Sequence, residues 1–373
     1  MKLFKSLLVA PAALGLLAPM AATANEVTIS DFTPAEELAI TNSRVDGLEA
    51  RMNNIEAGSF SETTTASFSA DMAIGAVDGG TATTDDAVEA YYGFQIDLNT
   101  SFTGEDSLDI SLDAGNAGGA VTEFDLNGTT NEALTVDGVS YTFPLGDATV
   151  FVGDNTDGSA LFSTACVYGG PSNTLDDCGN VSANFAGGGT AAGASVDFEN
   201  GFTAAVGYAG TGSSTSGLLT EEGLDSYGVN VAYTGDNYGV SATYAMSETD
   251  EAGGYEEDNF TAINAYYTPE SFPVSLSFGY EWGVDGSAAA TADETTSYFI
   301  GVQFDEVGPG TLGTAFGTKT PTVEETEDLL MYEVFYSYPI NDGMTITPLA
   351  YIKEFSGTTD DETGVMVKTS FSF

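Results

Sequence analysis

Downstream of the first 60 residues, apolar and polar side chains alternate with a period of two. In the segment SLDISLDAG, for example, Leu108, Ile110 and Leu112 alternate with polar residues that include Asp109 and Asp113. Successive side chains of a β-strand point to opposite faces of a sheet. The alternation therefore predicts strands of a sheet with one apolar face and one polar, acidic face.

Sixteen segments carry this alternation, and each is predicted to form a strand. They fall near residues 62–76, 89–103, 105–117, 134–145, 147–153, 191–199, 201–210, 224–234, 237–247, 258–268, 272–284, 295–306, 309–319, 329–338, 343–355 and 363–373. Short turns of Gly, Asp, Asn or Pro, such as ENG at 199–201, alternate with longer polar loops. This order predicts an up-and-down antiparallel sheet whose two ends differ.

These features favour an all-β fold, an antiparallel transmembrane β-barrel of about 16 strands over residues 61–373. Membrane barrels combine an even strand number, short turns at one end, longer loops at the other and an apolar lipid-facing side. The C-terminal segment TGVMVKTSFSF then forms the closing strand and ends at Phe373. Aromatic residues at strand ends are predicted to form the interfacial girdles, namely Tyr91, Tyr92, Phe272, Tyr298, Tyr336 and Tyr338.

Residues 1–24 have the pattern of an export signal peptide. Lys2 and Lys5 precede the apolar run LLVAPAALGLLAPM, and the motif ATA ends at Ala24 as a cleavage site. A transmembrane anchor needs about 20 apolar residues. The run is shorter than this and contains Pro11 and Pro19. The pattern therefore favours cleavable export over a membrane anchor.

Residues 25–60 are predicted to form a short periplasmic helix with coiled-coil character. Apolar and small positions repeat with heptad spacing and define a seam of Leu38, Thr41, Val45, Leu48, Met52 and Ile55. Gly47 weakens such a helix by roughly 1 kcal/mol. The seam is compatible with self-association or with one amphipathic helix lying on its own domain.

The charge balance excludes several classes of function. Lys and Arg total 7 against 56 Asp and Glu, and the formal net charge is −49. A surface this acidic repels phosphate backbones, so no nucleic-acid partner is expected. The chain has no His, which excludes a Ser-His dyad and a His metal site. No catalytic residue, metal or cofactor is predicted, although an acid-only enzyme mechanism stays open.

Two segments resemble a known family. RVDGLEARMNNIEAGSFSETTTASF at 44–68 is similar to the helix-to-barrel junction of cyanobacterial outer-membrane porins of the carbohydrate-selective (OprB-like) family, and MKLFKSLLVAPAALGLLAP is similar to their signal peptide. The resemblance implies a porin barrel, carbohydrate transport and a homotrimer. Family members typically carry a surface-layer-homology domain that binds cell-wall polymer. Few residues separate the signal from the heptads here, so we expect that domain to be absent and cell-wall binding not to occur through it.

The longest connection, near 153–190, is predicted to fold into the barrel. It follows the fifth strand, where sixteen-stranded porins have an inward constriction loop, and its place resembles theirs. It also holds both cysteines of the chain, Cys166 and Cys178. Two cysteines in an exported chain most simply form one disulfide, which would limit the freedom of the loop.

The predicted function is that of an outer-membrane porin, a passive diffusion channel for small hydrophilic solutes and inorganic ions. The scarcity of basic residues favours cations. By strand parity, the candidate pore-lining residues are Asp71, Asp97, Asp109, Asp113, Asp197, Glu281, Asp305, Glu333 and Lys368. Each carboxylate could equally be a solvated side chain without a role. Alternatives are a structural or adhesive outer-membrane barrel with little conductance, and a secreted acidic β-protein.

Overall fold

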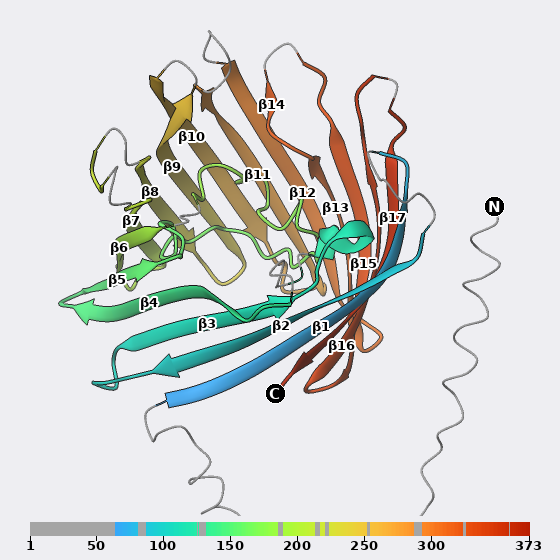
Figure 1. The fold of residues 1–373 in the computed structure, drawn as a ribbon, viewed down its shortest axis with the longest axis horizontal. Helices are drawn as coiled ribbons and strands as arrows, with labels where there is room; N and C mark the ends of the chain where they lie inside the picture. Colours follow the sequence, from blue (N-terminus) through green and yellow to red (C-terminus); the bar gives the residue numbers. More distant parts are fainter. Residues whose placement is uncertain are drawn as a thin grey trace, which may run out of the picture. The chain divides into compact units, whose positions relative to one another are not determined.

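The computed structural model describes residues 64–80, 87–124, 126, 132–185, 189–212, 217–220, 224–251, 254–286, 293–323, 326–357 and 359–373 (Figure 1). The predicted signal peptide and the predicted helix with its heptad seam lie outside the described residues. The chain divides into two compact units, Met1–Glu62 and Thr63–Phe373, of which the second is the barrel. No helix among the described residues is long and apolar enough to span a membrane.

The described residues form a closed antiparallel β-barrel of sixteen long strands, which confirms the predicted fold class. The strands are β1 (Thr64–Asp78), β2 (Glu89–Thr100), β3 (Ser107–Gly115), β4 (Thr135–Leu145), β5 (Ala148–Asp154), β6 (Thr190–Asp197), β7 (Phe202–Gly210), β8 (Ser226–Thr234), β9 (Tyr238–Glu251), β10 (Gly254–Tyr267), β11 (Val274–Asp285), β12 (Asp293–Val307), β13 (Gly310–Thr318), β15 (Leu330–Asn341), β16 (Met344–Lys353) and β17 (Glu362–Ser372). A two-residue strand, β14 (Thr322–Val323), pairs with β12. Every long strand lies beside its neighbours in sequence.

The barrel closes where the last strand meets the first. β1 and β17 pair in register over residues 69–78 and 363–372. Beyond this register, Phe68 and Phe373 exchange two backbone hydrogen bonds of 2.9 and 3.0 Å. Their rings stack with centroids 5.8 Å apart. The predicted closing strand therefore forms, and it ends against the start of β1.

The strands present an apolar side outwards and a polar side inwards, as β11 shows. Leu276, Phe278 and Trp282 are exposed on the outer face. On the opposite side of the same strand, Ser277 and Glu281 are buried inside the barrel. This is the face pattern that period-two alternation predicts.

One predicted girdle residue is on the wrong face. Tyr91 and Tyr92 are adjacent in β2, so their side chains must point to opposite sides of the sheet. Tyr92 is exposed on the outer side. Tyr91 packs against the apolar cluster inside the barrel, and its hydroxyl donates to Glu89 Oε2 at 3.0 Å. Tyr91 therefore cannot belong to a lipid-facing girdle.

Two connections occupy the interior of the barrel. The described part of the segment between β5 and β6, residues 155–185, is here called the inward loop, and Figure 1 shows it in green across the enclosed space. The segment between β3 and β4 contains a short 3₁₀ helix, η3 (Gly119–Phe124), which the sequence did not predict. Val121 and Phe124 of η3 are fully buried against β1, β2 and β17. The two segments fill part of the lumen with an apolar cluster.

Candidate functional site

The inward loop consists of two limbs, and the outgoing limb (residues 157–169) is fixed to the barrel wall by alternate backbone amides. The N–H groups of Ser163, Ala165, Val167 and Gly169 donate to Asn230 Oδ1 on β8 (3.0 Å), Ser241 Oγ on β9 (2.9 Å), Ser277 Oγ on β11 (3.0 Å) and Gln303 Oε1 on β12 (3.1 Å). Alternate amides of an extended chain point to the same side. Polar side chains that point inward from β8, β9, β11 and β12 thus supply one acceptor for each of these amides.

The returning limb (residues 177–185) is fixed mainly by a buried carboxylate. Glu281 Oε2 accepts hydrogen bonds from the backbone N–H groups of Ser182 and Ala183, both at 2.8 Å. Asn264 Nδ2 on β10 donates to the Cys178 carbonyl at 2.9 Å. A Cβ at Gly279 would collide with that same carbonyl, so the close approach of limb and wall depends on this glycine.

A tyrosine anchors the far end of the outgoing limb. The Tyr168 hydroxyl donates to Glu333 Oε1 at 2.6 Å, and its ring contacts Phe299 and Phe335 edge-on, with centroids 5.2 and 5.8 Å apart. Burial and the nearby Glu333 carboxylate raise the pKa of Tyr168 above its usual value. The phenol therefore remains a hydrogen-bond donor across the physiological pH range.

The two limbs are also joined to each other. Cys166 on the outgoing limb forms a disulfide with Cys178 on the returning limb, with Cα atoms 6.5 Å apart. Asn184 Nδ2 donates to Thr164 Oγ1 at 3.2 Å. A covalent bond and a hydrogen bond thus hold the limbs at a fixed separation.

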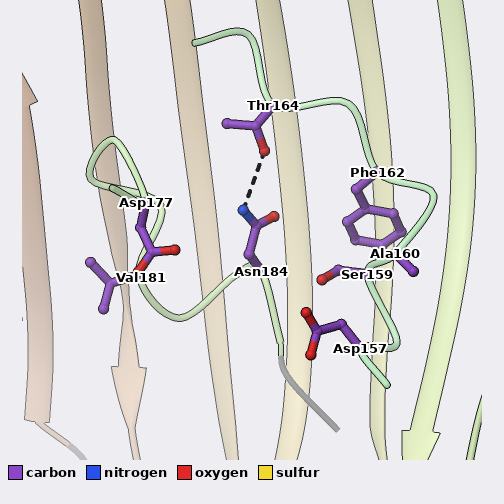
Figure 2. A pocket seen from close by; sticks show the side chains of 8 residues that line it. All are labelled: Asp157, Ser159, Ala160, Phe162, Thr164, Asp177, Val181 and Asn184. Atoms are coloured by element: carbon purple, nitrogen blue, oxygen red, sulfur yellow. Dashed lines mark hydrogen bonds between the residues drawn. The ribbon is translucent and has the colours of Figure 1, made fainter. Parts of the chain in front are cut away.

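A cavity of about 390 Å³ lies between the limbs (Figure 2). Its lining residues are Asp157, Ser159, Ala160, Phe162, Thr164, Asp177, Val181 and Asn184. Figure 2 shows Asp157 and Asp177 on either side of Asn184, and Phe162 on the outgoing limb. The loop therefore narrows the lumen and also encloses a polar recess of its own.

The predicted pore-lining acids do not form one group. Asp97 and Asp109 lie on the inward faces of β2 and β3, where Asp97 Oδ1 accepts from Ser111 Oγ at 2.7 Å and Asp109 Oδ1 from Asn99 Nδ2 at 2.6 Å. Asp113 lies on the same face of β3, and Asp71 occupies the adjoining β1. The structure thus brings four of the eight predicted acids together on β1, β2 and β3.

Two further acids lie apart from this group. Asp197 ends β6 and accepts the Glu199 N–H at 2.8 Å, and Asp305 lies near the end of β12, where Gln303 Nε2 donates to it at 3.2 Å. Both positions adjoin the short turns at one end of the barrel. Their carboxylates are solvent-exposed.

Glu281 and Glu333 have the predicted inward parity but not the predicted exposure. They are 2% and 3% exposed because the inward loop covers them. Each carboxylate is bonded to the loop instead of facing an open channel. This differs from the pore-lining position that the sequence suggested, since strand parity gives no information about what covers a face.

The three basic residues of the described region share one sector of the wall, directly after β13 and within β16 and β17. Lys353 forms an ion pair with Glu123 of η3. Lys368 Nζ lies 5.4 Å from the Phe124 ring centroid, and Lys319 Nζ lies 3.2 Å from that of Phe355. Burial and the nearby Lys353 lower the pKa of Lys319. Each base thus contacts an acid or an aromatic ring.

Sequence reasoning missed most of the polar residues that anchor the loop. Asn230, Ser241, Asn264 and Gln303 have inward parity, which the alternation does indicate, but parity cannot identify their partners. Among the described residues, no group of three or more acidic or cysteine side chains could hold a metal ion.

Comparison with known proteins places the fold among porins. No family model matches the chain. It is 26% identical over 404 residues to the uncharacterized protein alr4550 of Nostoc sp. (strain PCC 7120), covering 88% of this chain and 69% of that protein. The barrel superposes on OprB of Pseudomonas putida with a TM-score of 0.62 at 10% identity, covering 83% and 94% of the two chains. The barrel has the porin fold.

Two other solved structures agree. The anion-selective porin of Comamonas acidovorans has a TM-score of 0.61 at 14% identity, covering 83% of this chain and 99% of that chain. A mutant of the Rh. blastica porin has a TM-score of 0.55 at 14% identity, covering 83% and 100%. At these identities the likeness concerns the fold alone.

Proposed function

We propose that this protein is an outer-membrane porin, exported through a cleavable signal peptide, that lets small hydrophilic solutes and inorganic ions diffuse passively. The observation that supports this most is an inward loop fixed to the wall of a closed sixteen-strand barrel. Such a loop narrows a lumen without needing to move. Diffusion makes and breaks no bond, so the proposal requires neither catalytic residues nor a cofactor.

The outer face supports a lipid partner. Alternate residues such as Met72, Ile74, Leu276, Phe278 and Trp282 expose apolar side chains on the outside of the barrel. In water such a surface would promote aggregation, whereas in a bilayer it is the stable arrangement. This favours an outer-membrane barrel over a secreted acidic β-protein.

The proposed channel prefers cations. Four carboxylates share the inward faces of β1, β2 and β3, while Lys353 is paired with Glu123. Carboxylates along a pore attract cations and repel anions. Comamonas acidovorans has an anion-selective porin on a similar backbone, so the lining charges and not the fold must set selectivity.

Trimerisation and carbohydrate passage are further parts of the proposal, supported by the sequence resemblance at residues 44–68. Cross-linking of the full-length protein in detergent tests the first. Swelling of protein-containing liposomes in isosmotic sugar solutions tests the second.

The deciding experiment is reconstitution into a planar bilayer in KCl. Stepwise current increments, each from one inserted channel or trimer, are the expected result. The apolar cluster that fills part of the lumen leaves a structural or adhesive barrel as the competing function. Folded protein that inserts into the bilayer without conducting ions would support a structural or adhesive function instead.

A further inference from the structure

The cavity between the limbs of the inward loop has the dimensions of a ligand site. Its volume of about 390 Å³ falls within the range of small-molecule pockets, which is about 300–1,000 Å³. Both limbs contribute to the lining, Asp157 and Phe162 from one and Asp177 and Asn184 from the other. A solute in this cavity would contact two segments that are distant along the loop.

The walls of this cavity are fixed before any ligand arrives. The disulfide between Cys166 and Cys178 joins the limbs. Hydrogen bonds to Asn230 and Glu281 fix the outgoing and returning limbs to β8 and β11. A preformed cavity spares a ligand the entropic cost of ordering the loop.

The lining accepts hydrogen bonds and carries negative charge. Asp157 and Asp177 contribute two carboxylates, and no basic side chain lines the cavity. The described lysines all lie directly after β13 or within β16 and β17. A ligand with N–H donors and positive charge complements this set.

Part of the lining is apolar, which distinguishes an organic cation from a bare metal ion. Phe162, Ala160 and Val181 present carbon surface to the cavity. An aromatic ring attracts an ammonium group through its π-face, and methylene groups gain from contact with the other two side chains. A hydrated inorganic ion would leave this surface unused.

We propose that the cavity binds a small organic ammonium ion, in particular a short aliphatic diamine whose charged ends face Asp157 and Asp177. The proposal rests on the proposed porin function, because the cavity would then bind such solutes as they pass the inward loop in the pore. It also predicts which solutes the channel delays, which charge selectivity alone does not.

The test uses 1,4-diaminobutane, with 1,4-butanediol as an uncharged probe of the same length. In single-channel recordings in dilute KCl, the diamine is expected to cause resolved current interruptions and the diol none. Asp157→Asn and Asp177→Asn should each shorten the interruptions by about tenfold, since each removes one charge-assisted hydrogen bond.

Asp147→Asn is the matched control, because it removes the same charge from an exposed turn between β4 and β5. Its interruptions should last as long as those of the unaltered protein. Equal effects of diamine and diol would overturn the proposal. So would equal dwell times in Asp147→Asn, Asp157→Asn and Asp177→Asn.

Calorimetric titration of the detergent-solubilised full-length protein separates this proposal from the porin function. Diamine binding that is lost in Asp157→Asn supports the cavity site even if the barrel conducts no ions. A conducting channel that shows neither heat of binding nor interruptions retains the porin function and refutes the site.

Discussion

Asp106 shows how one carboxylate organises a turn of the barrel. It directly precedes β3, and its Oδ1 accepts from the backbone N–H groups of Phe102 at 3.0 Å and Thr103 at 2.7 Å. Its Oδ2 accepts the hydroxyl of Tyr141 on β4 at 2.6 Å. The Tyr141 hydrogen bond, followed by those from Thr103 and Ser101, holds the pKa of Asp106 below its usual value.

The lowered pKa fixes the sign of a pH effect. A carboxyl whose pKa is lower in the folded state stabilises that state above its unfolded pKa, which is about 3.9. The stabilisation is lost as the pH falls through the folded value. We expect Asp106→Asn to lower the thermal unfolding midpoint in detergent at pH 7, and the difference from the unaltered protein to shrink below about pH 4.

Glu105 offers a matched control in the same turn. Its side chain is exposed, so Glu105→Gln removes one charge without removing the hydrogen bonds of Asp106. The unfolding midpoint of Glu105→Gln should equal that of the unaltered protein both at pH 7 and at pH 3. If Asp106→Asn differed from the unaltered protein equally at pH 7 and pH 3, the ionised state of Asp106 would not be the source of stability.

At the scale of elements, the inward loop depends on its polar contacts with the wall. Glu281→Ala would leave the part-buried N–H group of Ser182 and the buried N–H group of Ala183 without an acceptor, at a cost of up to roughly 1–3 kcal/mol each. We expect faster proteolysis within the inward loop and noisier single-channel currents. Glu281→Gln retains an acceptor oxygen and should show a smaller effect. If Glu281→Ala were as resistant to protease as the unaltered protein, Glu281 would not be what fixes the limb.

The disulfide gives a second prediction about the same loop. Alkylation of the denatured, unreduced protein should label neither Cys166 nor Cys178, because the two are bonded to each other. A cross-link across this separation of 12 residues constrains the loop by about 2–4 kcal/mol. Reduction should therefore increase proteolysis within the inward loop while the barrel stays folded. Unfolding of the barrel on reduction would contradict the prediction that the disulfide stabilises only the inward loop.

The elements that sequence predicted well are those governed by local pattern. The alternation of buried and exposed residues along β11 follows from the sequence pattern alone, and the same pattern locates the other long strands. The inward course of the loop was predicted, but its contacts with the wall could not be, because the partners are far apart in sequence. Tyr168 and Glu333, for example, are 165 residues apart. Tyr91 was misplaced for a simpler reason, since two adjacent strand residues cannot share a face.

At the scale of the whole molecule, the last residue contributes to closure of the barrel. Phe373 exchanges two backbone hydrogen bonds with Phe68 and stacks on its ring. Deletion of Phe373 removes both bonds and the ring contact, and we expect much less membrane-inserted protein with export unchanged. Phe373→Ala retains the backbone bonds and should insert better than the deletion. Fractionation of membrane and periplasm measures both. Normal insertion of the deletion would show that other contacts suffice to close the barrel.

The distribution of charge over the barrel leads to a prediction about selectivity. Asp97, Asp109 and Asp113 lie together on the inward faces of β2 and β3, whereas Glu281 and Glu333 are covered by the inward loop. The first three therefore belong to the acids whose charge can act on ions in the lumen. The Debye length is about 10 Å at 0.1 M salt and about 3 Å at 1 M, so concentrated salt should screen their effect.

We expect the reconstituted channel to pass K⁺ more readily than Cl⁻ in dilute KCl, and the preference to shrink in molar KCl because the carboxylates are then screened. The zero-current potential across a KCl gradient measures it. Replacement of Asp97, Asp109 and Asp113 by Asn should weaken the preference. The control replaces the exposed turn acids Glu105, Asp147 and Asp236 by their amides, which changes the net charge equally, and should leave the potential unchanged. A potential of anion-selective sign at low salt would instead show that the sector of Lys353 and Lys368 controls the pore.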